Sequence, residues 1–451
     1  MPHRSSRDPR PNTHRTRRIP HLNEEDRLRP HIIYLNSHDT GRYVRPYGYP
    51  VATPRLQQFA EEGVVFRRAF SASPTCSPSR AALLTGRYPH EVGMLGLSHR
   101  GFSLTDPHQH LGHVLQSAGY RTVLAGLQHV AEDPEELGYD EVLPVSSHAA
   151  ADVAPAAADF VAGEHEQPFY LEVGFFETHR PYPAPGPQDD SRYLQPPSPV
   201  PDAPETREDM AGYSASARRF DDAVGQVLDA VEEAGIAEHT LVICTTDHGL
   251  AFPSMKCTLF DDGIGVMLMM RGPGGFTGGV VSDALVTQLD LFPTVCEITG
   301  AVPSDGLRGR SLLPLMGGSE ETLHDAVHAE LTYHVDYQPQ RCVRTDRYKY
   351  IRSFRELDHR ILEHTDAGAS KQYLTARGWG DQEQEAEMLF DVLLDPHEAH
   401  NLLADPGHSD TVTDMRARMD SWMRETDDPL LRGPVPAPPG ANVKGAEGFG
   451  A

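Results

Sequence analysis

Cysteine and long hydrophobic runs are both scarce in this sequence of 451 residues. Its five cysteines are scattered and odd in number, and they form no Cys-x-x-Cys pair, which excludes a disulfide framework and a zinc ribbon. No apolar run is long enough to span a bilayer, and the first 30 residues lack the central hydrophobic segment of a secretory signal. These absences predict a cytoplasmic protein without a membrane partner.

Positive charge is also in short supply, because 40 Lys and Arg face 65 Asp and Glu, which gives a formal net charge of −25. This balance argues against a nucleic-acid partner. It would also repel an anionic ligand at long range, so any such ligand needs a local cationic pocket. Eight of the arginines fall within residues 1–30, which we predict to form a disordered basic leader.

The length and the remaining composition suit a soluble globular protein with one large and one smaller domain. After about residue 325 the pattern changes to alternating short strands. We therefore predict a main domain over 31–325 and a C-terminal subdomain over 326–432. Residues 433–451 are rich in Gly, Pro and Ala, and they predict a flexible tail.

Short apolar runs that end in polar residues recur along the main domain. Each run predicts a buried strand. They are followed in turn by Asp39, His129, His179, and the pair Asp247 and His248. An isolated Asp or His at such a place more often caps a turn or has a structural role. Open α/β sheets, however, bind their ligands at the carboxyl ends of the strands, and this repeated pattern favours a site there.

A cysteine begins one predicted helix, in the run Cys76-Ser-Pro78-Ser-Arg80. The N-terminus of a helix carries positive partial charge and free N–H groups, so it stabilises an anion. Arg80, one turn along, would present its guanidinium on the same face, in a form suited to an oxyanion. The pattern favours a nucleophile, although a lone cysteine is more often a half-buried structural residue.

The run Cys-x-Pro-Ser-Arg, continued by Ala-Ala-Leu-Leu-Thr-Gly-Arg, resembles the signature of the type I sulfatases in the alkaline phosphatase superfamily. The resemblance covers about residues 31–430, and the segments 37–42 and 178–181 are similar to the heparan N-sulfatase-like branch. It implies an α/β fold with a large mixed, mostly parallel sheet sandwiched by helices. A small C-terminal α+β subdomain, an antiparallel sheet with one helix, would follow.

The resemblance also implies a cofactor and a modification. Asp39, Cys76, Asp247 and His248 would hold a divalent cation, which is usually calcium in this family. His38 stands where many members have a first Asp, so its role as a ligand stays open. Because histidine makes the site more nitrogenous than usual, manganese and zinc also stay open. A formylglycine-generating enzyme would convert Cys76 to formylglycine (3-oxoalanine).

The same resemblance implies the hydrolysis of a sulfate ester or sulfamate, on a sugar or an aryl group. Formylglycine would be hydrated to a gem-diol, of which one hydroxyl attacks sulfur and the other drives the release of sulfate. Asp247 would help to deprotonate the attacking hydroxyl. His179 would protonate the leaving atom, and His129 would assist the collapse to the aldehyde.

Two cationic groups, Arg80 and Lys256, would neutralise the transferring sulfate. Leu127 stands where the family has a Lys, so one positive contact is missing. This loss and the presence of His248 favour an alternative, a phosphonate monoester or phosphodiester hydrolase of the same superfamily. A second alternative is a catalytically inactive sulfatase-like binding protein, which would be expected to lose Cys76 or a metal-binding Asp.

Overall fold

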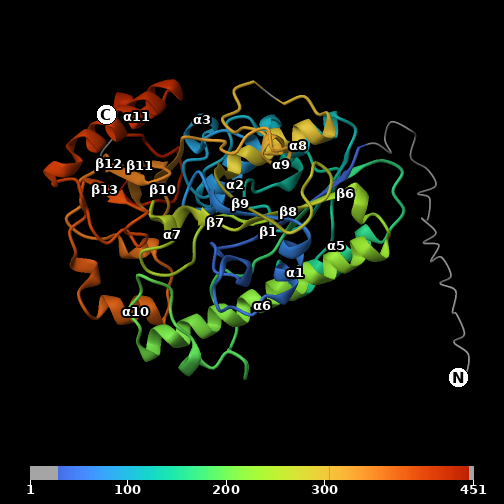
Figure 1. Cartoon of the computed structure of the whole chain (residues 1–451), viewed down its shortest axis with the longest axis horizontal. Helices are drawn as coiled ribbons and strands as arrows, with labels where there is room; N and C mark the ends of the chain where they lie inside the picture. Colours follow the sequence, from blue (N-terminus) through green and yellow to red (C-terminus); the bar gives the residue numbers. More distant parts are fainter. Residues whose placement is uncertain (1–28, 304, 446–451) are drawn as a thin grey trace, which may run out of the picture.

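The computed structural model describes residues 29–303 and 305–445, so most of the predicted basic leader lies outside the described residues (Figure 1). A nine-stranded sheet has the order β4-β3-β5-β1-β6-β8-β2-β7, with β9 paired to β2. Five of the strand pairs are parallel and three are antiparallel. The strands are β1 (His31–Ser37), β2 (Val64–Phe70), β3 (Arg121–Gly126), β4 (Glu141–Val142), β5 (Phe169–Gly174), β6 (Thr240–Thr246), β7 (Gly265–Val266), β8 (Leu268–Arg271) and β9 (Val280–Thr287).

The central strands are buried on both faces, which is why they read as continuous apolar runs. In β1, Ile32 and Tyr34 belong to one core cluster, whereas Ile33 and Leu35 belong to the cluster on the opposite face. One face is covered by α1 (Pro54–Glu62), α5 (Ala150–Val161) and α6 (Pro204–Glu233), and the other by α2 (Cys76–Thr85), α3 (Pro89–Val92), α4 (Leu111–Ser117) and α8 (Leu291–Thr299) (Figure 1). The mixed, mostly parallel sheet sandwiched by helices is thereby confirmed.

The long helix α6 (Pro204–Glu233) begins with Pro204 in its first turn. A proline is tolerated there because the first N–H groups of a helix have no partner within it. No helix in the described part of the chain is long and apolar enough to cross a bilayer. The α-helices are α1 (Pro54–Glu62), α2 (Cys76–Thr85), α3 (Pro89–Val92), α4 (Leu111–Ser117), α5 (Ala150–Val161), α6 (Pro204–Glu233), α7 (Asp261–Ile264), α8 (Leu291–Thr299), α9 (Leu313–Met316), α10 (Ala369–Thr375) and α11 (Ser409–Glu425).

A separate antiparallel sheet forms the C-terminal region, drawn in orange and red in Figure 1. Its strands are β10 (Ala326–Tyr333), β11 (Tyr337–Thr345), β12 (Tyr348–Ser353) and β13 (Glu387–Asp391). Helix α11 packs on one face of this sheet. The other face packs against the main domain, for example with Cys342 and Ile351 in one cluster with Phe70 and Leu285. This arrangement confirms the predicted C-terminal α+β subdomain.

A turn and the first residues of the predicted tail lie beside the strands of this sheet. The run 342–351 spans the end of β11 and the start of β12. The chain reverses between them, where the N–H of Tyr348 donates to Thr345 Oγ1 at 3.0 Å. Within the predicted tail, Val435 is buried and its N–H donates to Tyr337 Oη at 2.9 Å, so the first residues of the tail pack against β11. The domain boundaries themselves stay a prediction.

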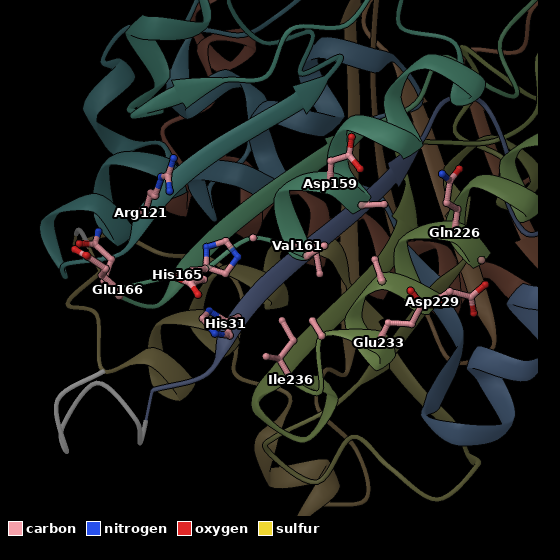
Figure 2. Close-up of a pocket in the computed structure, with 18 of the residues that line it drawn as sticks. His31, Arg121, Asp159, Val161, His165, Glu166, Gln226, Asp229, Glu233 and Ile236 are labelled. Atoms are coloured by element: carbon pink, nitrogen blue, oxygen red, sulfur yellow. The ribbon is translucent and has the colours of Figure 1, made fainter. Parts of the chain in front are cut away.

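The two ends of the large sheet differ in character. At the amino ends of β1 and β3, a pocket of about 1460 Å³ opens between α5 and α6, with His31, Arg121 and His165 on its wall (Figure 2). None of the predicted site residues lines this pocket. They lie instead past the carboxyl ends of the strands, as expected for an open α/β sheet.

Candidate active site

Two parallel strands place the central carboxylates side by side. Strands β1 and β6 pair in register, with Ser37 opposite Thr246, and each chain continues directly into the site. Asp39 and Asp247 follow these strand ends, and the N–H of Asp39 donates to Asp247 Oδ1 at 2.9 Å. The register of one strand pair therefore brings together two carboxylates that are 208 residues apart in the chain.

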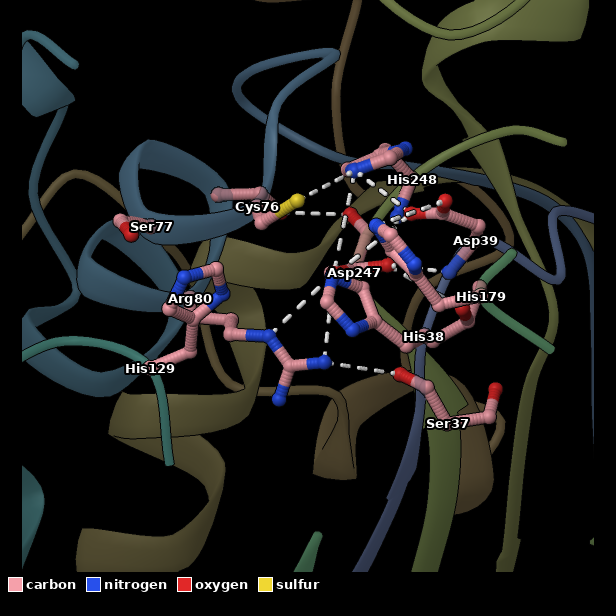
Figure 3. Close-up of polar contacts among 12 residues, drawn as sticks. Ser37, His38, Asp39, Cys76, Ser77, Arg80, His129, His179, Asp247 and His248 are labelled. Carbon is pink, nitrogen blue, oxygen red and sulfur yellow. Dashed lines mark hydrogen bonds and ion pairs between the residues drawn. The ribbon is translucent and has the colours of Figure 1, made fainter. Parts of the chain in front are cut away.

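The cysteine lies in the first turn of α2, with Thr75 extended before it. Its Sγ is 3.3 Å from His248 Nε2 (Figure 3). Every residue of α2 is buried, so the start of the helix is held firmly against the sheet. Ser79, on the same helix, donates to the carbonyl oxygen of Asp247 at 2.5 Å, which ties the helix to the end of β6.

These groups form a buried cluster that could hold a metal ion. One ligand atom from each of five side chains lies within 4.8 Å of all the others: His38, Asp39, Cys76, Asp247 and His248. Asp39 Oδ1 and both ring nitrogens of His38 are buried without a hydrogen-bond partner. His248 Nδ1 lies 3.0 Å from the carbonyl oxygen of Gly249, a contact that orients Nε2 into the cluster. The unsatisfied atoms and the oriented imidazole fit a divalent cation.

The protonation states in the cluster suit the binding of a metal ion. Burial raises the pKa of Asp247, but His248 and Arg80 outweigh that effect and bring it to about 2. Burial lowers the pKa of His38 well below its ordinary value, and the nearby His179 adds to this effect. At neutral pH the cluster thus offers an ionised carboxylate and an uncharged imidazole, which are the forms that bind metals.

Two cations flank the cluster. Arg80 is 1% exposed, and both its Nε and Nη2 lie 3.2 Å from Asp247 Oδ2. Lys256 Nζ lies 2.8 Å from Asp39 Oδ2 and 3.0 Å from Asp366 Oδ2. Burial lowers the pKa of Lys256, but Asp39 outweighs it, so the pKa is raised well above its ordinary value. Both groups are therefore permanent charges beside the cysteine.

The two predicted histidines lie on different sides of the cluster. His179 is 24% exposed, and its Nε2 is 3.4 Å from Lys256 Nζ and 3.8 Å from Asp39 Oδ2. The His129 ring centroid is 5.5 Å from that of His38, and its Nε2 is 3.0 Å from His99 Nδ1. Burial lowers the pKa of His129 to about 3, with Arg80 as the next cause, so this imidazole is uncharged at neutral pH.

Backbone conformation is unusual at two of these positions. Asp39 and His129, which both follow strand ends, have φ near +59°. Non-glycine residues rarely adopt the left-handed region, and such strain concentrates at functional sites. In Figure 3 the Asp39 side chain lies in the cluster, whereas the His129 ring lies beside Arg80.

Sequence reasoning missed three polar residues at this site. Asp366 contacts Lys256, and His99 contacts His129. His334 is buried, and the charges that lower its pKa after burial itself include Lys256. None of the three follows a strand of the large sheet or belongs to the cysteine motif, so no local pattern marks them. The predicted residues do lie together, while their individual roles stay predictions.

Comparison with known proteins agrees with this geometry. The family model Sulfatase matches residues 30–301, and the model N-sulphoglucosamine sulphohydrolase, C-terminal, matches residues 252–371. N-sulphoglucosamine sulphohydrolase from Homo sapiens is 30% identical over 453 residues, which cover 85% of this chain and 88% of that protein. An ulvan-active sulfatase from Formosa agariphila is 29% identical, with coverage of 93% and 85%.

A solved structure gives the same result for the fold. It shows a protein in complex with its substrate D-glucosamine-2-N,6-O-disulfate, and it superposes with a TM-score of 0.72 at 16% identity. The alignment covers 90% of this chain and 99% of that one. The Sulfatase model spans more than half of the chain, and the human relative matches nearly its whole length. The chain therefore belongs to the sulfatase family, in the branch similar to the N-sulphoglucosamine sulphohydrolases, and is a sulfuric ester hydrolase.

Proposed function

We propose that this protein removes a sulfate group from a saccharide, as a sulfate ester or a sulfamate, by means of a formylglycine at position 76 and a divalent cation. The observation that carries the proposal is the buried cluster at the start of α2, where Cys76, Asp39 and Asp247 meet two imidazoles and two cations. The names of the relatives support a sulfated sugar as the substrate class.

The cysteine itself is poorly suited to act as a thiolate. Burial raises the pKa of Cys76 well above its ordinary value, although Lys256 acts in the opposite direction. A protonated thiol is a weak nucleophile. Formylglycine at this position would supply a hydrated aldehyde, whose hydroxyl is a nucleophile independent of that pKa. Conversion by a formylglycine-generating enzyme is therefore part of the proposal.

Asp39, Asp247 and His248, with residue 76, would hold the cation, and His38 offers a further nitrogen. When bound there, a divalent ion would act as a Lewis acid on a sulfate oxygen. Calcium prefers oxygen ligands, whereas imidazole suits manganese and zinc better. The two histidines of the cluster favour manganese or zinc over the calcium that is usual for the family.

The remaining residues divide the work of charge and proton transfer. Arg80 and Lys256 would stabilise the negative oxygens of the transferring group, and such electrostatic stabilisation is often the main source of rate enhancement. Asp247, ionised at neutral pH, would accept a proton from the attacking hydroxyl. His179, partly open to solvent, would donate one to the leaving oxygen or nitrogen. His129 is uncharged at neutral pH and would assist the step in which sulfate is released.

Mass spectrometry of the tryptic peptide over residues 69–80 tests the modification. In protein from the native host, or co-produced with a formylglycine-generating enzyme, we expect this peptide to be ~18 Da lighter than its unmodified form. We expect that fraction of the protein to resist alkylation at position 76 and to carry the sulfatase activity. An active enzyme with a fully alkylatable Cys76 would contradict the proposal.

The variant Cys76→Ala provides the matching functional test. We expect it to lose at least ~10³-fold in turnover, since it removes the nucleophile, and to fold normally because alanine is well tolerated in a helix. Cys244→Ala is a matched control, because Cys244 is a buried cysteine in β6 outside the metal cluster. Equal activity of the two variants would contradict the assignment of position 76.

A second candidate function is the hydrolysis of a phosphonate monoester or phosphodiester. Leu127 in place of a Lys removes one positive contact, and His248 adds a nitrogen donor to the metal cluster. Comparison of kcat/KM for an aryl sulfate and the corresponding aryl phosphonate separates the two. Equal or faster turnover of the phosphonate would reverse our order.

A further inference from the structure

A carboxylate from the C-terminal region lies at the mouth of the site. Asp366 follows the 3-10 helix η9 (Leu362–His364) and precedes α10. Its Oδ2 lies 3.0 Å from Lys256 Nζ, and one of its oxygens lies within 4.8 Å of a His179 ring nitrogen. It belongs to no motif of the main domain, and neither the metal site nor the proton transfers proposed above require it.

The segment that carries Asp366 is anchored on both sides. On one side, the N–H of Ser370 donates to Asp209 Oδ2 at 3.1 Å, and Asp209 forms a bidentate ion pair with Arg180. On the other side, His364 Nδ1 lies 2.8 Å from Gln338 Oε1. These contacts tie the segment to α6, to the chain beside His179 and to β11, so the place of the carboxylate is set by the fold.

Asp366 lies nearer to solvent than Lys256 does. The lysine bridges Asp39, whose side chain is fully buried in the metal cluster, and Asp366, whose side chain is 26% exposed. His179 is exposed to a similar extent, 24%. Asp366 and His179 therefore both face the entrance, where the part of the substrate that leaves must lie while its sulfate is held at the cluster.

A carboxylate at this place does not help to bind sulfate. Burial raises the pKa of Asp366, but Lys256 and His179 outweigh that effect, so the pKa is lower than usual and the group is ionised at neutral pH. It repels an anionic group and shares the charge of Lys256. The carboxylate is suited instead to a positive charge on the substrate.

Sulfate esters and sulfamates differ in whether the leaving atom carries a positive charge. An ester oxygen is too weakly basic to be protonated in advance, so it takes its proton as the S–O bond breaks and leaves as a neutral alcohol. The nitrogen of a sulfamate must be protonated before the S–N bond breaks, and it is then cationic. His179 would give that proton, the electron pair of the S–N bond would stay on nitrogen, and sulfur would form its new bond to the attacking oxygen. The free amine then takes a second proton from water.

We propose that Asp366 is a specificity-determining residue that favours sulfamates over sulfate esters, because its carboxylate stabilises the positive charge on the leaving nitrogen. The inference rests on the proposed function and deepens it, since it names the bond that this site cleaves best.

Asp366→Asn, in metal-loaded enzyme that carries formylglycine, tests the inference. With D-glucosamine N-sulfate we expect kcat/KM to fall about 10- to 100-fold, as for the loss of a hydrogen bond to a charged group, with most of the loss in kcat. With 4-nitrophenyl sulfate we expect kcat/KM to stay the same or rise, because Lys256 is no longer shared. Asp366→Glu should restore part of the preference for the sulfamate.

Glu363→Gln is the matched control. It makes the same chemical change in the same segment, but Glu363 pairs with Lys444 Nζ at 2.7 Å, and both side chains are more than half exposed. We expect this variant to leave kcat/KM unchanged for both substrates. The ratio of the two kcat/KM values, measured on one preparation, does not depend on the amount of folded enzyme. Equal loss on both substrates in the Asp366 variant would overturn the inference, as would a wild type inert toward the sulfamate. A wild type inert toward both would overturn the proposed function as well.

Discussion

At the scale of single residues, the donor atoms of the cluster set its chemistry. His248 Nε2 lies 3.2 Å from Asp39 Oδ1, and its other nitrogen contacts a backbone carbonyl. His38 Nε2 lies 3.3 Å from Asp247 Oδ2. A site with two imidazole nitrogens beside two carboxylates differs from the all-oxygen surroundings that calcium prefers. We therefore expect these two imidazoles to shift the preference of the site toward manganese or zinc.

His248→Asn tests whether the imidazole of His248 affects which metal ion the cluster binds. After chelation, we expect wild-type protein to gain more thermal stability from Mn²⁺ or Zn²⁺ than from Ca²⁺. An ion present at 100 times its own Kd raises the free energy of unfolding by about 2.7 kcal/mol. In the variant, an amide oxygen replaces the imidazole, so calcium should gain relative to the other two ions. Calorimetry and the measured metal content check both statements.

The control for this experiment is His99→Asn, since His99 contacts His129 and is not part of the metal cluster. It should leave the order of the three ions as in the wild type. The same order of ions in all three proteins would show that His248 is not a ligand.

At the scale of elements, the ends of β3 and β5 position the turn that carries His129. The N–H of Leu127 donates to the carbonyl oxygen of Gly174 at 2.9 Å, and the backbones lie so close that a Cβ at Gly174 would be 1.8 Å from Leu127 O. Gly126 has φ of +87°, where its missing side chain also avoids Gly174. The close approach of two strand ends is therefore a requirement for the site.

Gly174→Ala is expected to push the His129 turn away from the cluster. We expect a loss of about 1–3 kcal/mol in the free energy of unfolding, as for an overpacked core, together with a fall in kcat. Denaturant titration and steady-state kinetics measure the two effects. Gly317→Ala is the control, because a Cβ there would be 3.6 Å from its nearest atom, an ordinary contact. Wild-type activity in the Gly174 variant would contradict the role of this turn.

At the scale of the whole molecule, several buried histidines make stability depend on pH. Burial is the main cause that lowers their pKa from 6.5 to about 3 in His31, His110, His129 and His328. The unfolded chain therefore binds more protons between these pH values, so its free energy falls relative to the folded state as pH drops. The contribution of these four histidines to the free energy of unfolding is fully present above about pH 6.5 and is lost as the pH falls toward 3.

His110→Asn tests one part of this dependence away from the catalytic cluster. His110 is fully buried and accepts a hydrogen bond from the N–H of Gly112 at the start of α4, a capping contact that Asn can also make. Between pH 6 and 4, we expect the slope of unfolding free energy against pH to decrease by ~1.4 kcal/mol per pH unit. Denaturant titrations at several pH values measure it. His400→Asn, at the surface, should leave the slope unchanged, and an equal slope in both variants would contradict the account.

Local patterns were sufficient for much of the site. Cys76 and Arg80 belong to one short motif, and Asp39 and Asp247 each follow an apolar run, so their chemistry is readable without a structure. The family resemblance implied the large sheet and its helices, and the apolar runs predicted individual strands because burial on both faces leaves a strong apolar signal. The place of Asp366 in the site was not predictable, because no pattern in its own segment points to Lys256, which is 110 residues away.

The sequence by itself pointed to Cys76, to the carboxylates and, through the family resemblance, to the class of fold, because each of these signals lies in residues close together in the chain. Only the tertiary structure decided what surrounds them: the C-terminal region docks through a shared apolar core and thereby brings Asp366 to Lys256. Apolar packing is non-directional, and its sequence signal says that a face is buried without saying against which partner. For that reason the mouth of the site, and with it the proposed preference for a sulfamate, could be seen only in the folded molecule.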